Sequence, residues 1–182
     1  GASPCVPATR FETSGARLGA KEIEALLRMK EIKHLSEVMD YPGVIAREPK
    51  IMRKIALARR YGKMIDGHAP GVRGEDLDRY ISAGISTDHE CSALGEALEK
   101  AQKGMMIIVR EGSAARNLKE LHPMLRTDKA MLCSDDLECP DLIEGHMDSI
   151  LRKAVRLGIH PLSAVIASTR RPVEHYGLDA GL

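Results

Sequence analysis

The chain has 182 residues with 27 lysine and arginine against 26 aspartate and glutamate side chains, so its charge does not suggest a nucleic-acid partner. Hydrophobic residues make up 43% of the chain, enough for a core, but aromatic residues only 3%, which argues against stacking platforms for single-stranded nucleic acid. The sequence shows no apolar run long enough to span a membrane, no signal peptide and no C-x-x-C pair. We therefore predict a cytoplasmic protein with reduced cysteines and no membrane partner.

Short apolar runs and amphipathic segments alternate along the chain. Helices are predicted at residues 21–30, 49–61, 75–83, 92–103, 115–121, 142–158, 161–168 and 172–176. Strands are predicted at residues 34–39, 63–65, 84–87, 105–110 and 129–133, with the end of a further strand in residues 1–9. We interpret Pro42-Gly43 as a turn. This alternation predicts an α/β fold with about six parallel strands and the helices outside, forming part of a (β/α)8 TIM-type barrel.

Polar side chains follow the predicted strands at their carboxyl ends. They are Glu37, His68, His89, Glu111 and Asp135. In a β/α barrel these ends meet at one pole, where active sites lie. A single histidine is more often structural, and Asp66-Gly-His alone could be a turn. The paired histidines at equivalent places, with nearby carboxylates, favour a zinc, manganese or iron site.

These residues stand in motifs that resemble the adenine deaminases of the amidohydrolase superfamily. The motifs occur in the family's order over nearly the whole chain: Pro4-Cys-Val-Pro-Ala-Thr, Phe11-Glu-Thr-Ser-Gly, Ser36-Glu-Val-Met, Asp66-Gly-His-Ala-Pro-Gly, Asp88-His-Glu, Arg110-Glu-Gly-Ser, Cys133-Ser-Asp-Asp and Glu144-Gly-His. The resemblance implies a hydrolase of purine metabolism that deaminates adenine to hypoxanthine and ammonia. It also implies two divalent metal ions, manganese, iron or zinc, in the intact site.

The resemblance assigns the metal ligands residue by residue. Glu37 would bridge two metal ions, and His68 and His89 would hold the second ion. Asp135 would bind a metal and act as the base for the attacking water. A pair of ions bridged by one carboxylate would activate that water and polarise the substrate.

Two further carboxylates are implied to lie near the substrate. Glu90, beside His89, could contact or protonate a purine nitrogen, and Asp136 could contact the substrate. For both residues, a supporting hydrogen-bond role is equally open.

The chain departs from the family's pattern in three places. It contains no His-x-His pair, which in the family binds the first metal ion, and residues 1–182 do not include the family's flanking domains. The strand order predicts that residues 1–182 form a single, incomplete barrel domain that begins within the third strand. The Ser-Asp-Asp block is usually followed by Arg-His-Pro in the family, whereas this chain has Leu137-Glu-Cys-Pro. This difference puts any role carried over to that loop in doubt. We expect little deamination by this chain alone, with the missing segment supplied by the parent chain or by a homo-oligomer.

Two other functions remain open from the residues. The same fold could serve another amidohydrolase that acts on a cyclic amide or amidine. It could also be a non-catalytic β/α module that binds only a metal or a partner.

Overall fold

The structure is a computed structural model that describes residues 1–9 and 11–180. It contains two compact units, Gly1–Glu90 and Cys91–Leu182, each with parallel strands and helices of its own. The predicted α/β class with parallel strands is confirmed. The (β/α)8 barrel and its single-domain organisation stay predictions.

The first unit is built on three short strands: β1 (His34–Val38), β2 (Met64–Gly67) and β3 (Thr87–Asp88). β1 and β2 are parallel, and the register pairs are His34 with Met64, Leu35 with Ile65 and Val38 with Gly67. Ala2 adds a parallel bridge on Leu35, which agrees with the strand end predicted for residues 1–9. The Ser86 N–H donates to the Ile65 carbonyl at 3.0 Å, so the segment leading into β3 lies along β2.

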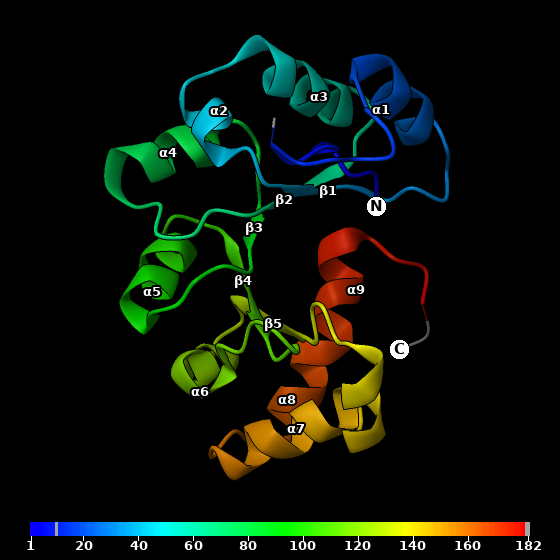
Figure 1. The fold of residues 1–182 in the computed structure, drawn as a ribbon. Helices are drawn as coiled ribbons and strands as arrows, with labels where there is room; N and C mark the ends of the chain where they lie inside the picture. Colours follow the sequence, from blue (N-terminus) through cyan, green and yellow to red (C-terminus); the bar gives the residue numbers. More distant parts are fainter. Residues whose placement is uncertain (10, 181–182) are drawn as a thin grey trace. The chain divides into compact units, whose positions relative to one another are not determined.

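Helices cover these strands in the described part of the first unit. They are α1 (Ala20–Leu27), α2 (Tyr41–Ile45), α3 (Pro49–Arg60) and α4 (Gly74–Ser82). α1 and α3 lie side by side over β1 and β2 (Figure 1). Their contact faces bury the aliphatic side chains Ile23 and Leu27 of α1 and Ile51 and Ile55 of α3, which is the spacing expected of amphipathic helices.

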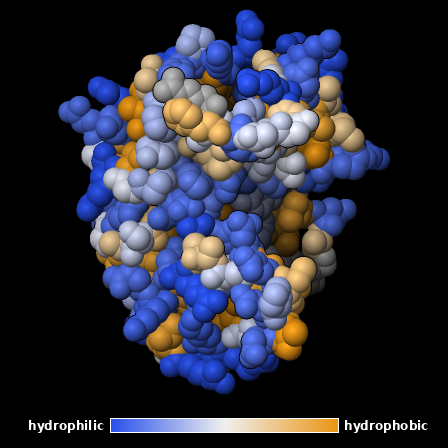
Figure 2. Space-filling view, viewed as in Figure 1, coloured by the Kyte–Doolittle hydropathy of each residue, from blue (hydrophilic) through white to orange (hydrophobic). Residues whose placement is uncertain are grey.

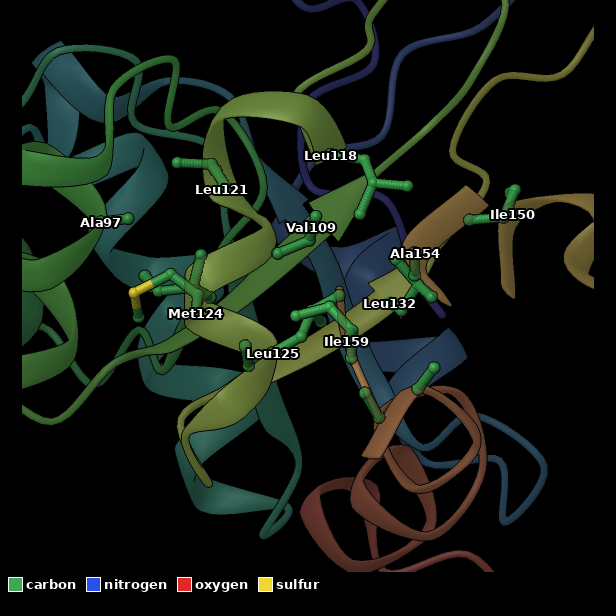
Figure 3. Close-up of a cluster of buried hydrophobic side chains, with 14 of the residues drawn as sticks. Ala97, Val109, Leu118, Leu121, Met124, Leu125, Leu132, Ile150, Ala154 and Ile159 are labelled. Atoms are coloured by element: carbon green, nitrogen blue, oxygen red, sulfur yellow. The ribbon is translucent and has the colours of Figure 1, made fainter. Parts of the chain in front are cut away.

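The second unit contains the parallel strands β4 (Met106–Arg110) and β5 (Ala130–Cys133). Its helices are α5 (Leu94–Gln102), α6 (Leu118–Leu121), α7 (Met147–Arg156), α8 (Pro161–Ser168) and α9 (Arg170–Tyr176), with 3-10 turns at η1 (His122–Arg126) and η2 (Cys139–Glu144). Side chains from the strands and helices gather into one aliphatic cluster, including Val109, Leu132, Leu121 and Ala154 (Figure 3). This core holds the carboxyl ends of β4 and β5 in place.

Two predictions in the first unit are wrong in detail. Pro42-Gly43 is part of helix α2 and not a turn, because the Asp40 carboxylate accepts the Gly43 N–H at 3.1 Å and caps the helix. The strand predicted at residues 84–87 begins only at Thr87. Gly84 has φ +101° and follows the end of α4, so it belongs to the turn that ends this helix.

Two predicted helices in the second unit are shorter than expected. The helix predicted at residues 142–158 is interrupted at Gly145, whose φ is +115°, and α7 begins at Met147. The helix predicted at residues 115–121 begins only at Leu118, because the Asn117 side chain accepts the Arg110 N–H at 2.8 Å and holds this segment to the end of β4. Local propensity did not reveal the break at Gly145 or the contact between Asn117 and Arg110.

The displayed face of the molecule is mostly hydrophilic, with hydrophobic residues scattered between charged ones (Figure 2). Among the described residues, none of the helices combines the length and the apolar character needed to cross a bilayer.

Candidate metal centre

Glu37 lies at the end of β1 in an unusual backbone conformation. Its φ is +24°, and its carbonyl accepts the Met39 N–H at 3.0 Å, which makes a tight turn. The register between β1 and β2 also shifts between Leu35 and Val38. A non-glycine residue with positive φ is strained, and such residues cluster at functional sites.

His68 and His89 follow β2 and β3, and their side chains converge on Glu37. The Oε1 atom of Glu37 lies 3.1 Å from His89 Nε2 and 3.7 Å from His68 Nδ1. The two imidazole rings are edge to face, with centroids 5.3 Å apart. One candidate ligand atom from each of the three residues lies within 4.8 Å of the other two. The structure therefore brings these three predicted ligands together at one end of the first unit's strands.

Glu90 joins the same cluster. Its Oε1 atom lies 3.4 Å from both His68 Nδ1 and His89 Nε2. This carboxylate thus stands beside the candidate ligands, which is compatible with both of its predicted roles, substrate contact and hydrogen-bond support.

The donor set fits a divalent metal ion. The His68 Nδ1 atom is buried and makes no hydrogen bond in the structure, although carboxylate oxygens of Glu90 and Glu37 lie 3.4 and 3.7 Å away, as expected of atoms arranged around an ion. Two donors bound to one tetrahedral zinc ion lie about 3.4 Å apart. The separations of 3.1 and 3.7 Å from Glu37 bracket that value. Imidazole and carboxylate together suit zinc, manganese and iron, so the geometry does not select one of them.

The imidazoles also favour the ionised form of Glu37. Their proximity, first that of His68 and then that of His89, holds the pKa of the Glu37 carboxyl well below its usual range, although partial burial acts in the opposite direction. The carboxylate is therefore ionised at neutral pH, which is the form that binds a metal.

Three fully buried polar residues that had no role predicted from the sequence lie beside this cluster: Tyr80, Thr87 and Asp88. Their side chains accept hydrogen bonds from the backbone around His68. The only available signal was their polarity in otherwise apolar strand and helix positions.

Asp135 belongs to the second unit, where it follows β5 with φ +61°. Its Oδ1 atom accepts the N–H of Asp136 at 2.7 Å, and its Oδ2 atom accepts a hydrogen bond from the guanidinium of Arg110. Arg110 ends the neighbouring strand, but its pairing with Asp135 was not predicted from the sequence. The metal-binding and base roles of Asp135 stay predictions, as does the substrate contact of the exposed Asp136.

Glu111, the last of the predicted strand-end residues, also lies in the second unit. One of its carboxylate oxygens accepts from Lys153, and the other is buried without a hydrogen-bond partner. Glu111 lines a cavity of about 410 Å³ together with His146 and Lys153. His146 precedes α7, and its Nε2 atom lies 3.2 Å from the Ser134 hydroxyl. Glu111 is thus tied to its own unit's cavity by a partner that the sequence did not indicate.

Known proteins are similar to this chain over its whole length. A family model described as "Amidohydrolase family" matches residues 1–182. The adenine deaminase of Sulfurovum sp. is 54% identical over all of this chain and 34% of its own length. The adenine deaminase of Salinibacter ruber is 50% identical, with 100% of this chain and 34% of the relative covered. The adenine deaminase of Methanosarcina mazei is 49% identical, with 100% and 33% covered.

The predicted resemblance to adenine deaminases is confirmed by these relatives, of which the chain spans about a third of the length. The crystal structure of an uncharacterized protein matches 94% of this chain and 52% of that protein with a TM-score of 0.53. Because the two sequences are only 11% identical, this match speaks for the fold alone. The family model covers every residue, and the chain therefore belongs to the amidohydrolase family.

Proposed function

We propose that these residues belong to a metal-dependent enzyme that hydrolyses adenine to hypoxanthine and ammonia. The observation that carries the proposal is the convergence of Glu37, His68 and His89 within 4.8 Å. The adenine deaminases that match the chain at 49–54% identity support adenine as the substrate. The activity is proposed for the whole protein that contains this chain, acting in cytoplasmic purine metabolism.

Glu37, His68 and His89 would hold the metal ions, with Glu37 as the bridge. Manganese, iron and zinc all suit this donor set. When bound, such ions activate a water molecule and withdraw electron density from the substrate. The remaining ligands would come from the parent chain or from another subunit of a homo-oligomer.

The protein's own carboxylates would move the protons. The attacking water forms a bond to C6 of adenine, and Asp135 takes a proton from that water. The proton then passes to the exocyclic nitrogen, which leaves as ammonia when its bond to C6 breaks. The hydrogen bond from the Arg110 guanidinium supports this role, because it fixes the position of the Asp135 carboxylate.

Glu90 would hold the purine. Its carboxylate lies 3.4 Å from both imidazoles, so a substrate placed against the ligand cluster would meet it. It could share a proton with a ring nitrogen, and Asp136 could contribute a further contact.

The test is an assay of adenine deamination by the whole protein loaded with Mn²⁺, Fe²⁺ or Zn²⁺, in which the loss of adenine absorbance measures the rate. We expect turnover by the wild type, and for His68→Ala a loss of both metal content and turnover of at least about 100-fold. His122→Ala is the control, because that half-buried imidazole lies in the second unit, where its Nδ1 atom is 2.8 Å from the Lys119 carbonyl oxygen. Its metal content and rate should stay unchanged.

Three results would contradict the proposal. Unchanged metal content in His68→Ala would remove this residue from the ligand set. Activity on another cyclic amidine without activity on adenine would change the substrate. Rapid turnover by residues 1–182 alone would show that no further segment is needed for catalysis.

A further inference from the structure

We propose that Tyr80, Thr87 and Asp88 form a buried clamp that positions His68 against Glu37 and His89 and so determines the affinity of the site for metal. This inference rests on the proposed metal site. The three residues do not touch the ion or the substrate in this proposal, so their role is positioning and not catalysis.

The clamp holds three consecutive backbone N–H groups around His68. The Gly67 N–H donates to Thr87 Oγ1 at 3.1 Å, and the Ala69 N–H donates to Asp88 Oδ1 at 2.8 Å. Between them, the N–H of His68 itself donates to the Tyr80 hydroxyl at 2.9 Å. The three accepting side chains belong to residues with 0% exposure, so water does not compete for these N–H groups.

Each accepting side chain also belongs to, or contacts, an element that carries another candidate ligand. The Tyr80 hydroxyl donates to the Val38 carbonyl at 3.3 Å, and Val38 follows Glu37 directly. Thr87 and Asp88 are the two residues of β3, which His89 follows. The clamp therefore links the ends of β1, β2 and β3, from which Glu37, His68 and His89 project.

Folding alone would require only that these buried N–H groups find an acceptor. The arrangement goes further, because the acceptors are fixed to the neighbouring ligand-bearing strands. A metal site tolerates ligand displacements of only about 0.2 Å. A small shift of the His68 backbone would therefore be detected first as weaker metal binding.

Tyr80 is the most informative residue of the clamp. Replacing it with Phe keeps the ring in its buried position and removes both hydrogen bonds of the hydroxyl. Burial also raises the pKa of Tyr80 far above its ordinary value, so the hydroxyl keeps its proton and can donate to Val38 throughout the usable pH range.

The experiment compares Tyr80→Phe with Tyr61→Phe in the full chain. The Tyr61 hydroxyl also makes two hydrogen bonds, from Arg28 at 3.0 Å and to Glu24 at 2.8 Å, but it joins α1 to α3 and contacts no candidate ligand. Co²⁺ titration would give the dissociation constant, and the visible absorption bands of bound Co²⁺ would report ligand geometry. We expect about a 10-fold weaker affinity and a changed spectrum for Tyr80→Phe, and values within twofold of wild type for Tyr61→Phe.

A second pair of variants keeps the test decisive if Tyr80→Phe does not fold by circular dichroism. Thr87→Ser keeps the hydroxyl that accepts the Gly67 N–H, whereas Thr87→Val keeps the shape and removes it. We expect affinity close to wild type for the serine variant and about 10-fold weaker binding for the valine variant.

The outcomes separate the clamp from the proposed function. If the wild type binds Co²⁺ and both Tyr80→Phe and Thr87→Val bind equally well, the clamp is wrong and the metal site stands. If Tyr61→Phe weakens binding as much as Tyr80→Phe, the effect is general destabilisation and the clamp is again wrong. If the wild type binds no Co²⁺, Mn²⁺ or Zn²⁺, the proposed metal site fails, and the clamp fails with it.

Discussion

Replacing Gly67 with Ala should disrupt the close approach of β2 to β3. A Cβ atom at Gly67 would lie 2.1 Å from the backbone oxygen of Thr87, 2.8 Å from Ile85 Cγ2 and 3.0 Å from the Tyr80 hydroxyl. The first of these contacts is with backbone, so a side-chain rotation cannot relieve it. The strands themselves must separate.

The size of this movement follows from the contact distance. Ordinary van der Waals contact begins at 3.4 Å, so the Thr87 oxygen must move by about 1.3 Å relative to Gly67. Overpacking of this kind costs about 1–3 kcal/mol of unfolding free energy, and backbone contact places the expected loss near the upper end. Because His68 and His89 follow these two strands, the same movement should weaken metal binding by about 10- to 100-fold.

Urea unfolding followed by circular dichroism and a Mn²⁺ titration would measure the two effects. Gly95→Ala in α5 is the matched control, because a Cβ there meets nothing within 4 Å. That control should be more stable by about 0.5 kcal/mol and should bind metal as the wild type does. A Gly67→Ala variant with unchanged unfolding free energy and unchanged metal affinity would refute the reasoning.

Three further results are expected. Lys100 Nζ lies 2.6 Å from Glu96 Oε1 in a buried pair, so Lys100→Met should lower the unfolding free energy by about 3–5 kcal/mol in urea titrations, and an unchanged midpoint would contradict this. Burial raises the pKa of the Cys133 thiol to about 11, whereas Cys139 is exposed. Iodoacetamide at neutral pH should therefore alkylate Cys139 before Cys133, as followed by mass spectrometry. Equal alkylation rates of the two cysteines would contradict this prediction. The pKa of Glu37 is lowered in the fold, so its ionised carboxylate stabilises the metal-free protein above the ordinary carboxyl pKa of 4.5, and this stabilisation is lost as the pH falls below that value. The unfolding free energy of Glu37→Gln should therefore depend less on pH in the acid range than that of the wild type. Identical pH profiles of the two proteins would exclude this effect.

The strands and most helices could be predicted because their signals are local. The apolar run that became β4 (Met106–Arg110) is continuous, and α3 (Pro49–Arg60) has both its periodic apolar face and a proline in its first turn. The strand-end positions of Glu37, His68 and His89 follow from the same pattern. Their convergence required only that parallel strands end at one edge.

The supporting residues could not be predicted, because their roles depend on contacts between distant segments. Tyr80 occupies an apolar position of α4, where its sequence context indicates only core packing. Its hydroxyl reaches His68 and Val38, which are 12 and 42 residues away in the chain. The capped helix at Tyr41–Ile45 was missed for a different and local reason, because the Pro-Gly pair obscures the cap that Asp40 supplies.

Each of the two units holds one predicted metal ligand with a strained backbone conformation. Among the described non-glycine residues, φ is positive at Glu37, Arg47 and Asp135, and two of these are predicted ligands. Such conformations cost about 1–3 kcal/mol and persist only where surrounding contacts enforce them. Beside Glu37, the Tyr80 hydroxyl donates to the carbonyl of the next residue, and beside Asp135 the guanidinium of Arg110 donates to the carboxylate. Both contacts lie within the unit that holds the strained residue, so each unit supplies its own hydrogen bond next to the residue that would contribute a carboxylate to the proposed reaction.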